Sequence, residues 1–494
     1  MEQAFTNVIV HNDERPKVDL PSQGRPSAQT NGVVAEGRDT HGSNADPVPF
    51  PIAIVGMGMR LPGNVNCTED FWDFLINKRD GLCRVPDSRY NVEAFYDESR
   101  PGAIRTKNGH FLHQDISQLD NVFFGIGKPE AEKLDPQQRL LLEVVWECME
   151  NAGQVNWQGS NIGCYVGVFG EDWLDILSKD SLQHDRFRVM SAGDFALSNR
   201  VSYIYDLHGP SVTLRTGCSS SMVGLHDACQ ALYAGDCSSA LVAGTNLIMG
   251  PTMTTTMSEN MVLSTSGICR TFDAAADGYG RGEAINVIYI KPLHDALREG
   301  DPIRAVIRST AVNCDGKTPT ISTPGSEAQE RLIRHAYQKA RIKGEEVSKT
   351  AFFECHGTGT IVGDTVEASV VANIFGNEGI YIGAVKPNVG HSEGASGITS
   401  IIKCVLALEH NTIPPNVHFH TPNPKIPFDS AKLDVPVSPL SWPAGKRERV
   451  SVNSFGIGGT NAHAALPLTF EDNFGFSRIM LPTRNQKTGP FPSL

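Results

Sequence analysis

The chain has 494 residues, of which 40% are hydrophobic and 20% charged, and its formal net charge is −12. These proportions are typical of a globular protein, and the negative charge argues against general binding of nucleic acids or anionic membranes, since both need a basic face. The 11 cysteines are an odd number without a framework spacing. No signal segment opens the chain, and no apolar run approaches the roughly 18–20 residues that span a bilayer. We therefore expect a reduced, cytoplasmic protein without membrane or nucleic-acid partners.

The predicted elements alternate between strands and helices. Residues 1–48 are rich in Gly, Ser, Asn, Asp and Pro, which predicts a disordered segment, and a buried strand is expected to open at Pro51. The further strand predictions are 161–168, 240–248, 284–291, 303–313, 351–355 and 380–385. The helix predictions are 129–151, 219–234, 326–341, 365–374 and 395–409. Apolar strands between amphipathic helices indicate a sheet covered on both faces, the α/β class. Residues 467–494 are expected to form an irregular tail.

A candidate nucleophile lies in Arg215-Thr-Gly-Cys-Ser-Ser-Ser221, between a short predicted strand at 211–214 and a helix. Cys218 would therefore be near free backbone N–H groups and the positive end of a helix dipole, which can lower the pKa of a thiol and activate it toward a thioester. Gly217 would permit the sharp turn that exposes such a residue. The alternative is that Cys218 is only a small buried residue at a helix start. Taken alone, this segment favours that alternative over a nucleophile.

Three further segments place polar groups at strand ends. His356 follows a predicted strand in Glu354-Cys-His-Gly-Thr-Gly-Thr-Ile-Val-Gly-Asp364, and His391 is at a glycine-rich turn before a helix. Asn453-Ser-Phe-Gly-Ile-Gly-Gly-Thr-Asn-Ala-His463 predicts a glycine loop whose N–H groups can stabilise an oxyanion. Each segment alone is a weak signal.

Together these segments resemble the β-ketoacyl synthases of the thiolase-like family over residues 50–466. The motifs Ala53–Gly58, Asp135–Arg139 and Leu197–Arg200 fit the same family, so all of these motifs occur in the expected order. The usual run before the nucleophile is Asp-Thr-Ala-Cys, and Arg215-Thr-Gly-Cys218 resembles the variant of fungal iterative, reducing polyketide synthases. The resemblance implies a thiolase-like five-layered α/β/α/β/α fold with two pseudo-duplicated halves, expected at residues 49–300 and 301–466.

The resemblance also implies a mechanism. Cys218 would hold the growing acyl chain as a thioester, while His356 and His391 would polarise the carbonyl of a malonyl thioester as it loses carbon dioxide. The resulting enolate would attack the acyl group, with the backbone N–H groups of Cys218 and Ile457 as the oxyanion hole. Ile457 is at a position where many relatives carry Phe.

Supporting residues and partners follow from the same resemblance. Lys386, Asn388 and Glu393 would support the site, and Thr358 and Thr360 would contact a phosphopantetheine arm. No metal or bound cofactor is expected, because that arm belongs to an acyl carrier protein or to CoA. The expected partners are an acyl- or malonyl-loaded acyl carrier protein and a second copy in a homodimer. An acidic carrier would need a local basic patch.

The sequence lacks a Gly-x-Asp-Ser carrier attachment motif; Ser178-Lys-Asp-Ser-Leu182 has no leading Gly. We expect a truncated or single-domain form of a larger synthase. The alternatives are a catalytically inactive remnant or partner subunit that keeps the fold, and a CoA-dependent thiolase. Thiolase chemistry typically uses a second cysteine near the C-terminus, where the last cysteine here is Cys404.

Other motifs carry weaker alternatives. Gly390-His-Ser-Glu-Gly394 matches a hydrolase nucleophile elbow, with Ser392 as nucleophile and a histidine base, but it lies too near the C-terminus for such a sheet. The candidate bases are His410, His418, His420 and His463.

Three further features of the sequence are better explained by structural roles than by ligand binding. Gly56–Leu61 and Gly278–Gly282 predict tight turns rather than phosphate-binding loops. The spacing of Cys355, His356 and His391 suits no structural zinc module. The helix at 129–151 is expected to serve core or dimer packing.

Overall fold

Two six-stranded sheets organise the protein. The structure is a computed structural model that describes residues 50–179 and 186–468, all within one unit of the chain. The predicted disordered segment 1–48 and nearly all of the predicted tail lie outside the described residues.

The first sheet has the strand order β5-β4-β6-β7-β1-β8. Its strands are β1 (Ile52–Arg60), β4 (Ile162–Val168), β5 (Ser211–Leu214), β6 (Ser239–Asn246), β7 (Ala284–Pro292) and β8 (Ala305–Ile307). The second sheet has the order β13-β11-β10-β15-β16-β9. Its strands are β9 (Ser309–Cys314), β10 (Thr350–Glu354), β11 (Ile380–Gly383), β13 (Leu433–Asp434), β15 (Arg447–Phe455) and β16 (Thr460–Pro467).

The two sheets share one topology. Numbered within each half, five strands follow the order 3-2-4-5-1: β5-β4-β6-β7-β1 in the first and β11-β10-β15-β16-β9 in the second. In both halves the first two pairings are parallel and the last two antiparallel. The pseudo-duplication expected from the sequence is therefore visible in strand order and direction.

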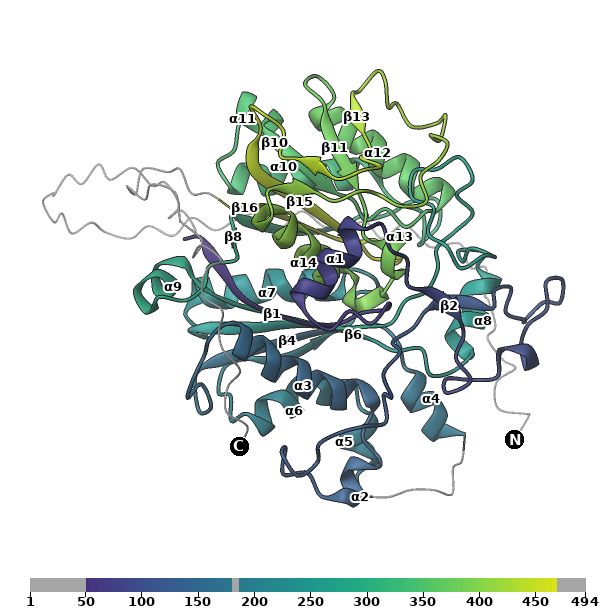
Figure 1. Ribbon diagram of the computed structural model, residues 1–494, viewed down its shortest axis with the longest axis vertical. Coiled ribbons are helices and arrows are strands. Elements are labelled where there is room, and N and C mark those ends of the chain that lie inside the picture. Colours follow the sequence, from purple (N-terminus) through teal and green to yellow (C-terminus); the bar gives the residue numbers. More distant parts are fainter. Residues whose placement is uncertain (1–49, 180–185, 469–494) are drawn as a thin grey trace, which may run out of the picture. The chain divides into compact units, whose positions relative to one another are not determined.

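Helices cover both faces of each sheet and complete five layers (Figure 1). The outer layer on the first sheet contains α3 (Pro136–Asn151) and α6 (Ala196–Ile204). The middle layer contains α7 (Ser220–Ala234) and α14 (Ser396–Glu409), which pack on each other and on both sheets. The outer layer on the second sheet contains α10 (Ser326–Lys339) and α12 (Ile361–Phe375).

The remaining elements are short. The helices are α1 (Thr68–Ile76), α2 (Lys128–Ala131), α4 (Asp172–Ser178), α5 (Arg188–Ala192), α8 (Thr252–Glu259), α9 (Leu293–Glu299), α11 (Glu345–Ser348) and α13 (Lys386–Val389), with 3-10 turns η1 (Val92–Ala94) and η2 (Glu393–Ala395). Two strand pairs, β2 (Leu82–Arg84) with β3 (Asn108–His110) and β12 (Thr412–Ile413) with β14 (Leu440–Ser441), lie outside the main sheets.

Alternating side chains of β1 supply two cores. Ile52 and Ile54 belong to the cluster between the sheets, whereas Ala53 and Val55 belong to the cluster under the outer helices. A strand buried on both faces needs apolar residues at every position, which explains the continuous apolar pattern.

Two glycine motifs are extended rather than the tight turns predicted, and the first lies in a strand. Gly56 and Gly58 lie within β1, and an added Cβ would lie 2.5 Å from the carbonyl oxygens of Cys148 and Val144 respectively, both in α3. These glycines permit close packing of helix on sheet. Gly278–Gly282 is also extended, with isolated bridges to neighbouring segments.

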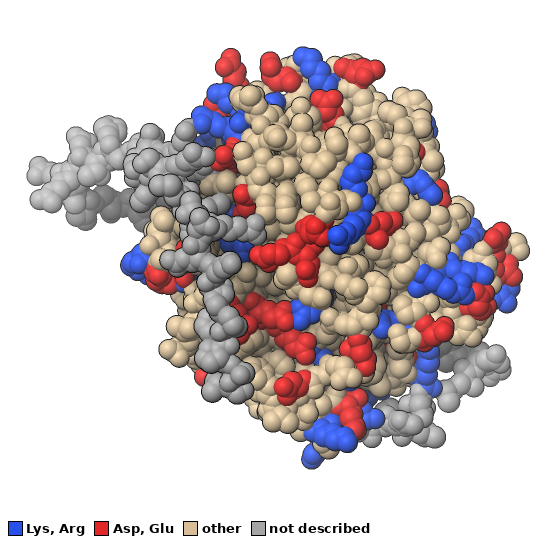
Figure 2. All heavy atoms as spheres, viewed as in Figure 1, with Lys and Arg blue, Asp and Glu red and all other residues tan. Residues whose placement is uncertain are grey.

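No helix within the described ranges is both long and apolar enough to cross a membrane. On the face shown in Figure 2, acidic and basic side chains of the described residues are interspersed and most of the surface is uncharged.

Candidate active site

Cys218 lies in the turn between β5 and α7. Gly217 has φ +70°, a left-handed conformation that glycine adopts without steric cost. The carbonyl oxygen of Cys218 accepts hydrogen bonds from Ser396 Oγ (3.1 Å) and Ser454 Oγ (3.0 Å). The turn is thus held by α14 and β15, both from the second half of the chain, and the cysteine is only 7% exposed.

The environment of Cys218 favours the protonated thiol. Burial, with a smaller contribution from the Glu393 carboxylate, raises its pKa to about 12, while the backbone N–H of Ile457 and the Lys386 ammonium act in the opposite direction. The lowered thiol pKa expected from the helix N-terminus is therefore wrong, because desolvation outweighs the favourable dipoles.

Arg215, the unusual residue before the nucleophile, forms ion pairs with Glu171 and, at 3.1 Å, with Asp194. Its guanidinium also donates to the carbonyl oxygen of Phe169 (3.1 Å). These partners neutralise Arg215 outside the catalytic turn.

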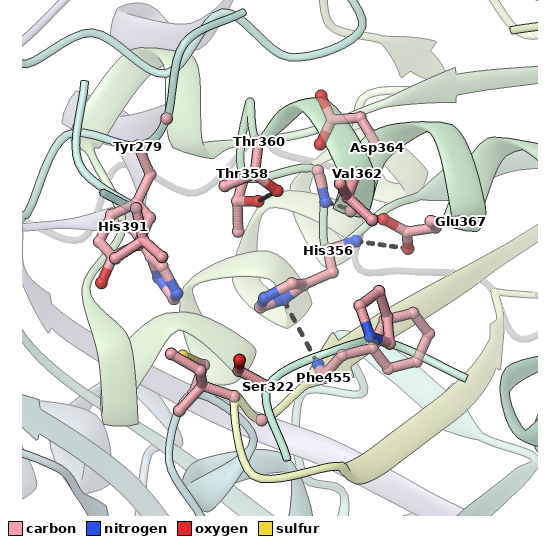
Figure 3. Close-up of a pocket in the computed structure, with 18 of the residues that line it drawn as sticks. Tyr279, Ser322, His356, Thr358, Thr360, Val362, Asp364, Glu367, His391 and Phe455 are labelled. Atoms are coloured by element: carbon pink, nitrogen blue, oxygen red, sulfur yellow. Dashed lines mark hydrogen bonds between the residues drawn. The ribbon is translucent and has the colours of Figure 1, made fainter. Parts of the chain in front are cut away.

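Two histidines converge on the thiol. His356 follows β10, and His391 follows the turn after α13. One nitrogen of each ring and Cys218 Sγ all lie within 4.8 Å of one another. The ring centroids are 5.3 Å apart with an interplanar angle of 85°, and both rings point into the same cavity (Figure 3). The structure therefore brings together the three residues predicted to be catalytic.

Backbone donors fix the tautomer of each histidine. The Phe455 N–H donates to His356 Nδ1 (3.4 Å), and the Glu393 N–H donates to His391 Nδ1 (3.2 Å). Because each Nδ1 accepts, each neutral ring carries its proton on Nε2. The buried Nε2 of His391 has no hydrogen-bond partner in the structure, so it can donate to a bound molecule.

Both imidazoles are held neutral. Burial lowers the pKa of His356 and of His391 well below the usual imidazole range, and the ammonium of Lys386 lowers both further. A pair of neutral N–H donors is suited to stabilising negative charge on an enolate oxygen.

The same hydrogen bonds argue against a metal at this cluster, although Cys218, His356 and His391 are close enough to hold one. A metal-binding imidazole normally donates its second N–H to a carboxylate or carbonyl oxygen. Here each Nδ1 faces a backbone donor instead, so coordination through Nε2 would set two N–H groups against each other.

The tight turn 456–459 between β15 and β16 carries Ile457. The predicted glycine loop at 453–463 is therefore shorter than expected, because strands occupy its two ends. The Ile457 N–H lowers the pKa of the Cys218 thiol, which burial raises, and Ile457 is 37% exposed at the cavity.

None of the three predicted supporting residues lines the cavity. Lys386 is fully buried, and burial lowers its pKa while Glu354 and Glu367 oppose that shift. Asn388 donates to the backbone oxygen of Arg79 (2.9 Å) and is not among the cavity residues. Glu393 contacts His391 through its own N–H.

A cavity of about 370 Å³ surrounds the cluster. Thr358 and Thr360 line it, with hydroxyl oxygens 3.0 Å apart. The cavity lining also contains residues to which the sequence motifs assigned no role: Phe169, Met257, Met261, Tyr279, Ser322, Asp364, Glu367 and Phe455.

The positions of Asp364 and Glu367 in the sequence could have indicated their structural role. They are three residues apart in the first turns of α12, directly after the glycine-rich loop, where carboxylates accept free N–H groups. Glu367 accepts from the N–H groups of His356 (2.7 Å) and Gly357 (2.9 Å), and Asp364 accepts from Gly359 (3.0 Å). Both carboxylates shape the loop that presents His356.

The hydrolase alternative finds no geometric support. Ser392 is buried with its hydroxyl 3.3 Å from that of Thr399. Two of its candidate bases are engaged elsewhere: His463 Nδ1 lies 2.7 Å from Asn453 Oδ1, and His418 Nε2 lies 2.7 Å from Asp80.

Family models match nearly all of the described chain. The β-ketoacyl synthase N-terminal domain matches residues 50–296, the β-ketoacyl synthase C-terminal domain matches 304–420, and the ketoacyl-synthetase C-terminal extension matches 422–471.

Curated relatives are much longer than this chain. It is 59% identical over 420 residues to the highly reducing polyketide synthase gloL of Glarea lozoyensis, which covers 84% of this chain and 16% of that protein. It is 52% identical over 456 residues to the highly reducing polyketide synthase sphB of Aspergillus fumigatus, which covers 91% of this chain and 18% of that protein. The chain thus spans less than a fifth of the length of either relative.

Solved ketosynthase structures share the fold. The oxazolomycin ketosynthase domain OzmH KS7 of Streptomyces albus JA3453 matches with a TM-score of 0.79 and 32% identity, covering 85% of this chain and 74% of that one. The ketosynthase from module 6 of the bacillaene synthase of Bacillus subtilis 168 matches with a TM-score of 0.76 and 33% identity, covering 85% and 72%. The thiolase-like fold class predicted from the sequence is confirmed.

Proposed function

The chain belongs to the β-ketoacyl synthase family, whose ketosynthase domains catalyse decarboxylative Claisen condensation, and we propose that it joins an acyl chain held on Cys218 to a malonyl thioester. The product is a 3-oxoacyl thioester of polyketide biosynthesis. The observation that carries the proposal is the convergence of Cys218, His356 and His391 in one cavity. We also propose residues 49–300 and 301–466 as the two halves of the domain, and a cytoplasmic location.

In the first step, Cys218 Sγ attacks the carbonyl carbon of an acyl thioester. The thiol proton passes to the departing pantetheine sulfur, so the exchange conserves charge. The N–H groups of Cys218 and Ile457 stabilise the tetrahedral oxyanion.

In the second step, a malonyl thioester replaces the free pantetheine. Its carboxylate carbon leaves as carbon dioxide, and the electron pair of the broken C–C bond forms an enolate whose oxygen accepts from the Nε2 protons of His356 and His391. The enolate carbon then attacks the acyl-Cys218 carbonyl, and the Cys218 sulfur leaves as a thiolate that takes a proton from solvent to restore the thiol. Lys386 acts electrostatically by keeping both rings neutral.

The phosphopantetheine arm of a carrier protein is the proposed acyl donor, with Thr358 and Thr360 beside it. Among the described residues, no lysine or arginine lines the cavity, whereas Asp315 does, and so does Asp277, which pairs with Arg270 at 3.1 Å. CoA would bring a diphosphate and a 3′-phosphate toward these carboxylates, so a carrier-bound thioester suits the charge of the cavity better than CoA.

Exposed apolar side chains gather at the cavity. Ile361 and Val362 are 53% and 57% exposed although they line the cavity. Such exposed apolar residues beside a binding site are typical of a protein contact surface, and we propose that the carrier packs on them.

Intact mass after incubation with acyl-pantetheine tests the nucleophile. The wild type is expected to gain one acyl group, and Cys218→Ala none. Adding a malonyl-loaded carrier protein should then release the acyl group as a 3-oxoacyl product. Folded wild-type protein that gains no acyl group from several chain lengths would instead support the inactive-remnant alternative.

A further inference from the structure

A buried arginine outside the proposed mechanism lies directly behind His391. Arg281 is in the extended segment before β7. The His391 N–H donates to the carbonyl oxygen of Gly280 (2.7 Å), and the Gly282 N–H donates to the carbonyl oxygen of His391 (2.9 Å). The backbone on both sides of Arg281 therefore pairs with the catalytic histidine.

The Arg281 side chain grips Glu393 with two hydrogen bonds. Nε lies 2.8 Å from Oε1 and Nη2 lies 3.0 Å from Oε2. The two side chains are 4% and 0% exposed. A bidentate pair of this kind has a fixed relative orientation, and removal of one partner leaves an uncompensated buried charge.

Glu393 links Arg281 to His391, because its side chain binds Arg281 and its backbone N–H binds His391. Its φ is +45°, a left-handed conformation that is strained for a residue with a side chain. In this conformation the Glu393 N–H donates to His391 Nδ1 (3.2 Å). Anchoring the carboxylate keeps the backbone in the strained conformation and the N–H on Nδ1.

Arg281 also reaches the wall of the cavity. Its Nη1 donates to Thr254 Oγ1 (2.7 Å) in α8, the helix that carries Met257 into the cavity lining. One guanidinium thus connects the His391 turn to a wall of the substrate cavity.

We propose that Arg281 is a positioning residue for decarboxylation: through Glu393 it fixes His391 with Nδ1 as acceptor, so that Nε2 presents its proton to the enolate oxygen. This inference rests on the proposed function. Acylation of Cys218 uses the backbone N–H groups of Cys218 and Ile457, so it does not require this orientation of His391.

The two half-reactions separate a positioning role from a structural one. Arg281→Lys keeps a positive charge but loses the bidentate hydrogen bonding to Glu393. We expect malonyl decarboxylation, measured as carbon dioxide release from a malonyl-loaded carrier, to fall on the order of 10- to 100-fold, because small displacements of catalytic groups have effects of this size. Acylation measured by intact mass should change less than about twofold.

Arg89→Lys is the matched control. Arg89 forms the same bidentate contact with Glu283, at 2.8 and 2.9 Å, with side chains 2% and 0% exposed. These hydrogen bonds of Arg89 do not involve either catalytic histidine. If Arg89→Lys loses activity, we therefore expect the loss to parallel the loss of folded protein and to affect both half-reactions equally.

Equal losses of both half-reactions in Arg281→Lys, or no loss in either, would overturn the proposal. If Arg281→Lys does not fold, Glu393→Gln tests the same proposal. This variant keeps the backbone N–H but removes the negative charge that pairs with Arg281, so we again expect decarboxylation to fall more than acylation. A wild type that neither acylates nor decarboxylates would refute the proposed function itself, which distinguishes the two failures.

Discussion

Desolvation has opposite effects on the acid and base groups of the site, and both effects leave the groups neutral. Burial raises the pKa of the Cys218 thiol and lowers the pKa of both imidazoles. The site therefore holds a thiol and two neutral N–H donors near pH 7 rather than a thiolate–imidazolium pair. In the proposed mechanism, negative charge develops on the oxyanion and on the enolate oxygen, where neutral donors can stabilise it.

The raised thiol pKa predicts an unusual alkylation profile. Because the reactive thiolate fraction grows about tenfold for each pH unit below the pKa, alkylation of Cys218 by iodoacetamide should still be accelerating at about pH 10. An ordinary cysteine with a pKa of about 8.5 levels off sooner. Peptide mass spectrometry would follow Cys218, with the exposed Cys314 as an internal reference. A plateau for Cys218 below pH 9 would contradict the value of about 12.

Among the individual residues of the site, those within sequence motifs were predictable, whereas those whose role depends on packing were not. Cys218, His356 and His391 are predictable because each is in a characteristic run at a strand end. Arg281 is not, because its role depends on a contact with Glu393 across 112 positions of the chain. The direction of the Cys218 pKa shift was also wrong, since a sequence shows a helix start but not the depth of burial.

The turn between β15 and β16 depends on close backbone approach to the nucleophile turn. A Cβ on Gly456 would lie 2.3 Å from the carbonyl oxygen of Thr216, whereas a Cβ on Gly458 would meet nothing within 4 Å. Ile457, between these two glycines, carries the proposed oxyanion donor. The two glycines therefore form a matched pair for testing the turn.

Gly456→Ala should push the Ile457 N–H away from Cys218 and lower the condensation rate by about 10²- to 10³-fold, the usual effect of losing one oxyanion donor. Gly458→Ala should retain nearly wild-type rates. Both variants would be compared by single-turnover condensation and by thermal unfolding. Similar rates for the two alanine variants would show that the close approach of Gly456 does not matter for catalysis.

Most predicted elements exist, and their errors have local causes. The helix predicted at 129–151 is two helices, α2 and α3, because Pro136 begins α3 with Asp135 accepting the Gln137 N–H (2.8 Å) as its N-cap. The strand predicted at 303–313 is divided into β8 and β9, which belong to different sheets. Periodicity shows that a segment is extended, but not which sheet receives it.

The duplicated architecture explains why distant motifs meet. Cys218 and His391 follow the third strand of their respective halves, β5 and β11, and each precedes a central helix, α7 or α14. These helices pack against each other in the middle layer, so the residues before them are brought to one site. His356 follows the second strand of its half, and Ile457 connects the fourth to the fifth. The sequence could imply this arrangement only through a family resemblance, because strand order is not visible in periodicity.

We also propose that the chain forms a homodimer, which the edge of the first sheet favours. Among the described strands, β5 pairs only with β4. Val212 in this strand is 38% exposed, and the neighbouring helices expose further apolar side chains: Val189, Met190, Phe195 and Tyr203. An unpaired edge strand flanked by apolar residues is a ready surface for a second copy, and a two-fold axis would bury the same patch on both subunits.

Val212→Lys should therefore convert a dimer into a monomer, because a buried two-fold contact would place two unpaired lysines together. Light scattering after size exclusion should give about twice 53.6 kDa for the wild type and about 53.6 kDa for the variant. Val437→Lys, at a residue 47% exposed between β13 and β14 of the other half, is the control that should remain dimeric. A monomeric wild type would remove the dimer from the proposed function, and a dimeric Val212→Lys protein would place the interface away from β5.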